Sequence, residues 1–109
     1  MTHKGTATFI AQRTSAVILL PLAVWFLAGA VAHAGATYNE MRTWLATPLN
    51  AVLMGAFLLA GAFHMRIGLD EIIDDYIGAG ARGILKLLNF FAAAGAAGLA
   101  VYSLIAIAA

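Results

Sequence analysis

The chain has 109 residues, of which 63% are hydrophobic and only 10% are charged, and its mean hydropathy is +0.93. Soluble domains carry about a quarter charged residues, so this composition excludes an ordinary soluble protein and predicts a membrane protein. The length allows a few spanning helices but no additional catalytic domain of roughly 100 to 200 residues. The net charge of +1 gives no sign of nucleic-acid binding, and a chain without cysteine supplies neither a disulfide nor iron–sulfur thiolates.

Three stretches free of Asp, Glu, Lys and Arg approach or exceed the roughly 20 residues that a spanning helix needs. They cover residues 14–37, 48–65 and 87–109. The sequence therefore predicts an all-α membrane protein with three transmembrane helices in one membrane-anchor domain, residues 1–109. The helices are expected at about residues 14–36, 48–76 and 83–108.

The two connections between the predicted helices differ in composition. Residues 38–47 are polar and are predicted to form a loop. The sequence GAGARG, residues 78–83, is rich in glycine and is predicted to form a tight turn, whose short reach makes the second and third helices antiparallel neighbours. Pro21 lies inside the first span, where a membrane helix tolerates a kink.

The N-terminal segment shares some features with a secretory signal. Lys4 and Arg13 precede an apolar run that is followed by AHA at residues 32–34, a small-residue pattern that resembles a cleavage site. The apolar run is long for a signal sequence, however. We therefore expect this segment to be retained as a true first span.

Positive charges near the span ends predict the orientation of the chain. Lys4, Arg13, Arg82 and Lys86 lie on one side of the predicted spans, and only Arg42 lies on the other. The side with the excess is cytoplasmic in a bacterial inner membrane and faces the matrix in a mitochondrial inner membrane. We therefore expect the N-terminus and the second connection inside, with the first connection and the C-terminus outside.

The second predicted helix ends in a polar segment, HMRIGLDEIIDDY at residues 64–76. At about 1.5 Å per residue, a helix over 48–76 is roughly 43 Å long, which exceeds the hydrocarbon thickness of about 30 Å. Its last two turns are therefore expected to reach the inner headgroups. The acids at Asp70, Glu71 and 74–75 then form either a solvated helix end or a surface for a basic partner.

His64 lies in the apolar slab, about 24 Å along the helix from its start, where an ionisable side chain is a functional hypothesis by default. It is either a neutral histidine bonded to another helix or, as we favour, an axial ligand of a haem iron. Gly61 and Gly68 either leave room beside it for a flat macrocycle or let two helices approach closely. His33 differs from His64 in depth by about 15 Å or more, so we expect it to be an interfacial histidine and not a second ligand.

Two other side chains near the inner interface have alternative roles. Tyr76 suits either an aromatic belt or a hydrogen bond to a quinone oxygen, and it lies about 18 Å along the helix from His64, too far to share one small ligand. Arg66 is expected to reach toward the interface or pair with Asp70, in preference to meeting a haem propionate. In the third span, FFAAAGAAGLA at residues 90–100 is expected to be a small-residue packing surface.

The segment HMRIGLDEIIDDY resembles the signature H-x3-G-x6-D-Y of the smaller, D-type hydrophobic membrane-anchor subunits of succinate dehydrogenase. The matching positions are His64, Gly68, Asp75 and Tyr76. The sequence QRTSAVILL resembles the arginine and small hydroxyl residues at the mouth of that family's first helix, and the three-span plan and the length also agree. Family members often have a histidine about two turns before this arginine; here Ala7 takes that place and His3 lies farther away.

This resemblance implies an inner-membrane anchor that shares haem b with a second, cytochrome b-type anchor and docks an iron–sulfur subunit and a flavoprotein subunit. Electrons from succinate then reduce ubiquinone, and the chain itself carries no residue that oxidises succinate. The resemblance implies that His64 is an axial ligand of the haem iron and that Gly68 lies beside the haem. It places Arg13 near the propionates or the quinone mouth, makes Tyr76 a hydrogen-bond donor to the quinone, and gives Asp75 a supporting role there.

Two alternatives to a succinate dehydrogenase anchor are weighed. The anchor of a quinol:fumarate reductase has similar sites, and the reaction of that enzyme runs in the opposite direction. A haem-free small transporter or a structural three-span protein would instead use the acids for ion passage or leave them solvated. No acid lies at the centre of a predicted span, which disfavours ion passage.

Overall fold

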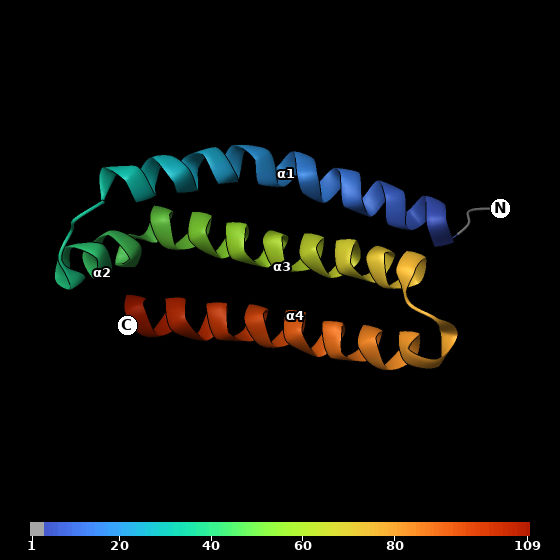
Figure 1. Ribbon diagram of the computed structural model, residues 1–109. Coiled ribbons are helices and arrows are strands. Elements are labelled where there is room, and N and C mark those ends of the chain that lie inside the picture. The colour runs from blue at the N-terminus through green and yellow to red at the C-terminus, as the bar shows by residue number, and fades with distance from the viewer. Residues whose placement is uncertain (1–3) are drawn as a thin grey trace.

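The structure of the protein is a computed structural model, in which residues 4–109 are described, so His3 lies outside the described residues. In chain order, the helices are α1 (Lys4–Ala32), α2 (Tyr38–Ala46), α3 (Pro48–Tyr76) and α4 (Ala79–Ala108) (Figure 1). Three of them, α1, α3 and α4, are long and apolar enough to cross a membrane. The predicted all-α architecture with three spans is therefore confirmed.

Helix α3 has the predicted bounds, whereas α1 does not. A proline suits the first turn of a helix, where its missing N–H costs nothing, and Pro48 begins α3 in this way. Helix α1 begins at Lys4, ten residues before the predicted start at 14, and ends at Ala32 instead of residue 36. The prediction used the stretch without charged residues, which is only the most apolar part of the helix. Polar residues such as Gln12 also form helix, so α1 continues toward the N-terminus without a break.

The connection between α1 and α3 is not the predicted loop, because residues 38–46 form the short helix α2. A capping box starts this helix: the Glu40 backbone N–H donates to Thr37 Oγ1 at 3.2 Å, and the Thr37 N–H donates to Glu40 Oε1 at 3.0 Å. The Thr37 backbone N–H lowers the pKa of the Glu40 carboxyl below its usual value. The sequence signal was the T-x-x-E pattern at 37–40, which is typical of a helix start.

The predicted glycine-rich turn over 78–83 is also wrong, because α4 already begins at Ala79. Only Ile77 and Gly78 separate α3 from α4, and the two helices run antiparallel as predicted (Figure 1). Arg82 Nη2 donates to the carbonyl oxygen of Ile77 at 3.1 Å, which closes this turn from the first turn of α4. Glycine lowers helix propensity by only about 1 kcal/mol, so the tertiary packing of a long helix overrides it.

Helix α3 lies between α1 and α4 and contacts both of them along their lengths (Figure 1). Within the described residues, α1 and α4 do not contact each other directly. The buried residues are correspondingly few: Met54, Ile67, Ala93, Ser15 and Asn89. Most large apolar side chains face outward, as expected of helices that are covered by lipid or by another membrane subunit.

An aromatic cluster holds α2 against α1 at the end of the molecule that contains α2, which we call the α2 end. Trp44 of α2 stacks on Trp25 of α1 with ring centroids 5.5 Å apart, and its ring lies 4.6 Å from that of His33. Gly29 makes this contact possible, since a Cβ built on it would lie 2.8 Å from two ring atoms of Trp44. The opposite end, with the α3–α4 turn, is called the turn end.

The close approach at Gly29 gives a first prediction. Gly29→Ala should lower the free energy of unfolding by about 1 to 3 kcal/mol, because the Trp44 ring is held by two other rings and cannot move aside without loss. Thermal unfolding in detergent, followed by tryptophan fluorescence and circular dichroism, measures the change. The matched control is Gly95→Ala in α4, where a Cβ meets nothing within 4 Å. Equal stability of the two variants would contradict the role given to Gly29.

Candidate functional site

His64 of α3 is hydrogen-bonded to Ser15 of α1. The distance from Ser15 Oγ to His64 Nδ1 is 2.7 Å, and Ser15 is only 4% exposed while the histidine is half-buried. Ser15 Oγ also lies 3.0 Å from the carbonyl oxygen of Gln12 and donates to it. The bond to another helix uses only one ring nitrogen, so His64 keeps Nε2 for a second partner.

The two glycines near His64 face α1. A Cβ built on Gly61 would lie 4.0 Å from a methyl carbon of Leu19, and one on Gly68 would lie 3.4 Å from Gln12 Nε2. Both added carbons would make ordinary van der Waals contacts, so the two glycines lie against α1 at normal packing distance.

An apolar groove of about 720 Å³ lies between α1 and α3 on the side of Ser15. Its walls come from both helices: Ala7, Ile10, Ala11, Thr14, Ser15, Ile18, Leu59, Ala60 and Phe63. One turn nearer the turn end, Gln12 Oε1 is buried and has no hydrogen-bond partner among the described residues. The surroundings of the Ser15–His64 pair are thus apolar and still offer an unused acceptor.

His33 lies far from His64, at the α2 end. Its Nδ1 bonds to the carbonyl oxygen of Gly29 at 2.8 Å, whereas His64 bonds to Ser15. Gly29 and Ser15 are fourteen residues apart on the same helix, about 21 Å along its axis. The predicted separation in depth of the two histidines is confirmed, and they cannot bind one metal ion together.

A buried asparagine links α3 to α4 nearer the turn end. Asn89 Nδ2 donates to the carbonyl oxygen of Arg66 at 2.8 Å and to Asp70 Oδ1 at 3.0 Å, and Asn89 is only 7% exposed. Its own Oδ1 has no partner among the described residues. Asp70 is therefore held by a neutral donor on the neighbouring helix, and this acid is not part of a solvated helix end.

Arg66 does not form the expected pair with Asp70, since no carboxylate in the described part of the chain pairs with it. Its Cζ atom instead lies 5.3 Å from the ring centroid of Phe90, and its Nε is buried without a partner among the described residues. Arg66 and Lys86 line a hollow of about 450 Å³ together with three acids of α3: Asp70, Glu71 and Asp74. This hollow combines both signs of charge.

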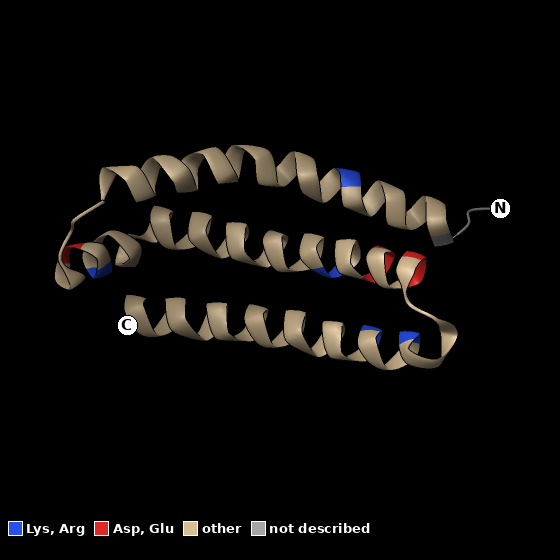
Figure 2. Cartoon of the chain, viewed as in Figure 1, with Lys and Arg blue, Asp and Glu red and all other residues tan. Residues whose placement is uncertain are grey.

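Charged residues lie in α2 and in the half of the bundle toward the turn end, where the acids of α3 are close to the turn (Figure 2). Lys86 Nζ lies 2.6 Å from Asp74 Oδ1, and Arg82 Nε lies 4.0 Å from the same atom. These pairs are partly exposed, so each contributes at most about 1 kcal/mol. They tie the last turns of α3 to the first turns of α4.

The last two residues of the signature, Asp75 and Tyr76, lie at the turn end and are exposed, as is Arg13 of α1. Tyr76, the last residue of α3, is 81% exposed, and the neighbouring Asp75 is also exposed. Arg13 is exposed on α1, with Cζ 5.2 Å from the ring centroid of Phe9. These three side chains are available to groups outside the chain, whereas His64 is partly enclosed within it.

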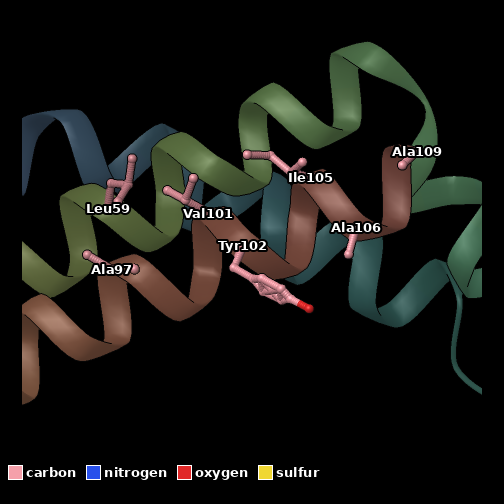
Figure 3. A pocket seen from close by; sticks show the side chains of 8 residues that line it. Leu59, Ala97, Val101, Tyr102, Ile105, Ala106 and Ala109 are labelled. Atoms are coloured by element: carbon pink, nitrogen blue, oxygen red, sulfur yellow. The ribbon is translucent and has the colours of Figure 1, made fainter.

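The small residues of α4 play two roles. Ala93 is buried against the neighbouring helix, in agreement with a packing surface over 90–100, but Gly95 and Gly98 face open space. A second apolar groove, of about 750 Å³, lies near the α2 end between α3 and α4 (Figure 3). Its lining includes Leu59 of α3 and Tyr102 of α4, and its surface is almost wholly apolar.

Ser15 and Asn89 are site residues that sequence reasoning did not single out. The sequence does indicate a role for Asn89, because it is an isolated amide in an apolar span, where polar side chains commonly form hydrogen bonds between helices. The indication for Ser15 is weaker, because a serine in a span can equally donate a hydrogen bond to a carbonyl oxygen of its own helix. Its pairing with His64 depends on how α1 and α3 are rotated, which no local pattern indicates.

Comparison with known proteins identifies the family. Residues 1–107 match the family described as succinate dehydrogenase/fumarate reductase transmembrane subunit. The chain is also 26% identical over 73 residues to the succinate dehydrogenase hydrophobic membrane anchor subunit of Rickettsia bellii (strain RML369-C), a match that covers 67% of this chain and 58% of that protein. No solved structure matches. The chain therefore belongs to the succinate dehydrogenase/fumarate reductase transmembrane subunit family and is a multi-pass membrane protein.

The Asn89 contacts give a second prediction. Asn89→Ala should destabilise the packing of α3 on α4 by about 1 to 2 kcal/mol, because it removes two hydrogen bonds and leaves an oxygen of Asp70 without its donor. Thermal unfolding in detergent measures the loss. Asn39→Ala, at an exposed position of α2, is the matched control and should leave stability unchanged. A loss as large in the control would refute the buried contact as the cause.

Proposed function

We propose that the chain is the membrane anchor of a succinate dehydrogenase that helps to bind haem b and ubiquinone. Its partners in this proposal are a second, cytochrome b-type anchor, an iron–sulfur subunit and a flavoprotein subunit. Membership of the family supports the anchor role. The observation that carries the haem part is His64, a half-buried histidine in a spanning helix whose Nδ1 is held by Ser15.

The residues around His64 fit one side of a haem site. Nitrogen of a neutral imidazole is a common ligand of haem iron, and His64 has one ring nitrogen left after its bond to Ser15. The adjacent groove is apolar, as the faces of a macrocycle require. Because His33 lies at the other end of α1, any second protein ligand of the haem would come from a partner subunit. Haem b, when bound, accepts and releases single electrons.

The turn end fits a quinone site shared with other subunits. Tyr76 is exposed there, so its hydroxyl can donate a hydrogen bond to a quinone carbonyl oxygen while its ring remains among acyl chains. Asp75, beside it, supports this site or the docking surface. Arg13 is exposed on α1, so its guanidinium is available to the haem propionates or to the mouth of the quinone site.

The turn end is also proposed as the docking end for the soluble subunits. The charged residues outside α2 lie in the half of the bundle toward this end (Figure 2). The basic residues near the span ends support a cytoplasmic or matrix location for it, on one side of an inner membrane. A quinol:fumarate reductase anchor is the second candidate, because the family description names both enzymes. Oxidation of succinate by the purified complex, compared with fumarate reduction, distinguishes them.

The proposed ligand gives a third prediction. In the purified complex, His64→Ala should abolish the b-type haem bands of the reduced-minus-oxidised spectrum, because it removes one axial nitrogen. His33→Ala is the matched control and should retain them, since the His33 ring lies at the α2 end, where it bonds to the Gly29 carbonyl oxygen and packs on Trp44. A full b-haem spectrum in assembled His64→Ala complex, or no such haem in the unaltered complex, would refute the assignment.

The proposed quinone contact gives a fourth prediction. Tyr76→Phe should reduce quinone reduction by about tenfold, the effect of a lost hydrogen bond of roughly 1.4 kcal/mol, while succinate oxidation with an artificial acceptor is retained. Tyr102→Phe, at an exposed tyrosine near the α2 end, is the matched control and should leave both activities intact. Equal loss of both activities in Tyr76→Phe would indicate failed assembly and contradict a specific quinone contact.

A further inference from the structure

We propose that Ser15 is a positioning residue that holds His64 in the Nδ1–H tautomer and thereby leaves Nε2 as the nitrogen that binds haem iron. This inference rests on the proposed role of His64 as a ligand and adds a residue of α1 to that site. Ser15 is 4% exposed, so no bulk water competes for its hydroxyl. Its hydroxyl forms two hydrogen bonds in the described part of the chain, with Gln12 and His64.

The proton count of the serine hydroxyl decides the tautomer. A hydroxyl has one proton to donate, whereas a backbone carbonyl oxygen can only accept. Ser15 Oγ and the Gln12 carbonyl oxygen are 3.0 Å apart, a distance at which two oxygens repel each other unless a proton lies between them. The hydroxyl proton therefore points to Gln12, and Ser15 Oγ accepts the bond of 2.7 Å from Nδ1–H of His64.

The tautomer of His64 determines which nitrogen is available to a metal. A neutral imidazole carries a single N–H, so protonation of Nδ1 leaves Nε2 with a free lone pair. Metal-binding histidines generally donate their other ring N–H to a protein acceptor, which fixes the ring and makes the ligand nitrogen more basic. Ser15 supplies such an acceptor from a neighbouring helix.

The other described histidine, His33, lies just beyond the end of α1 and bonds within its own segment of the chain. Nδ1 of His33 is hydrogen-bonded to the carbonyl oxygen of Gly29, which lies four residues earlier in the sequence. His64 instead reaches across to α1, against which Gly61 and Gly68 lie at ordinary packing distance. The ring orientation of His64 is therefore tied to the packing of α1 on α3.

The test uses the intact membrane complex with haem bound and compares Ser15→Ala with Ser15→Thr. The alanine variant removes the acceptor, so His64 becomes a less basic ligand and stabilises ferric haem less. We expect an upward shift of the haem midpoint potential, a changed low-spin electron paramagnetic resonance signal, and haem retention weakened by roughly tenfold. The threonine variant keeps the hydroxyl and should match the unaltered complex in all three measurements.

Two further variants separate the hydrogen bond from packing. Thr6→Ala removes an exposed hydroxyl of α1 that does not line the groove beside Ser15, so it should leave the potential and the resonance signal unchanged. Ser15→Cys nearly preserves volume but offers only a weak acceptor, so it should shift the potential in the same direction as alanine. If Ser15→Ala does not assemble, the comparison of Ser15→Cys with Ser15→Thr decides.

The proposal is overturned if the potential and the signal are unchanged when the hydroxyl is removed. It is equally overturned if Ser15→Thr shifts them as much as Ser15→Cys, because the hydroxyl would then be irrelevant. A different result would show that the proposed function is wrong, namely a b-haem spectrum that is retained in His64→Ala. In that case the ligand assignment is wrong whatever the Ser15 variants show.

Discussion

Polar side chains inside a membrane bundle need protein partners, because lipid offers them no hydrogen bonds. In this chain, polar groups of α3 have hydrogen-bond partners on both neighbouring long helices. His64 bonds to Ser15 of α1, and the backbone and carboxylate near Asp70 accept from Asn89 of α4. Since α1 and α4 do not contact each other within the described residues, both are positioned through α3. The two polar contacts therefore set the geometry of the whole bundle.

The length of α3 separates its polar residues by environment. With 29 residues, the helix is about 43 Å long and exceeds the apolar thickness of a bilayer. His64 lies within the enclosed part, whereas Asp75 and Tyr76 project from the turn end. A single helix can in this way serve a buried cofactor and a ligand at the surface, which is the division of roles that we propose for haem and quinone.

The sequence predicted the features that depend on composition and missed those that depend on side-chain placement. The bounds of α3 follow from Pro48 and from a long apolar run, and the predicted bounds agree with the structure. The glycines at 78–83 suggested a turn, but packing of a long helix overrides low propensity. The helix at 38–46 was missed although its T-x-x-E start is a recognised signal.

The candidate site was predicted in part. His64 was found because an ionisable side chain in an apolar span is rare, and the signature around it led to the family that the comparisons show. The sequence did not indicate that Ser15 is the partner of His64. The two residues are 49 positions apart in the chain, and their contact depends on how α1 and α3 are rotated about their axes. The two nearby glycines, predicted to lie close to the face of His64, face α1 at ordinary packing distance.

An electron cryomicroscopy map of the assembled membrane complex tests the central claim most directly. The account predicts haem iron bound to Nε2 of His64, with Nδ1 of the same ring facing Ser15 and the second axial ligand contributed by another subunit. Haem held by other residues of the complex, or a map without haem beside His64, would contradict it.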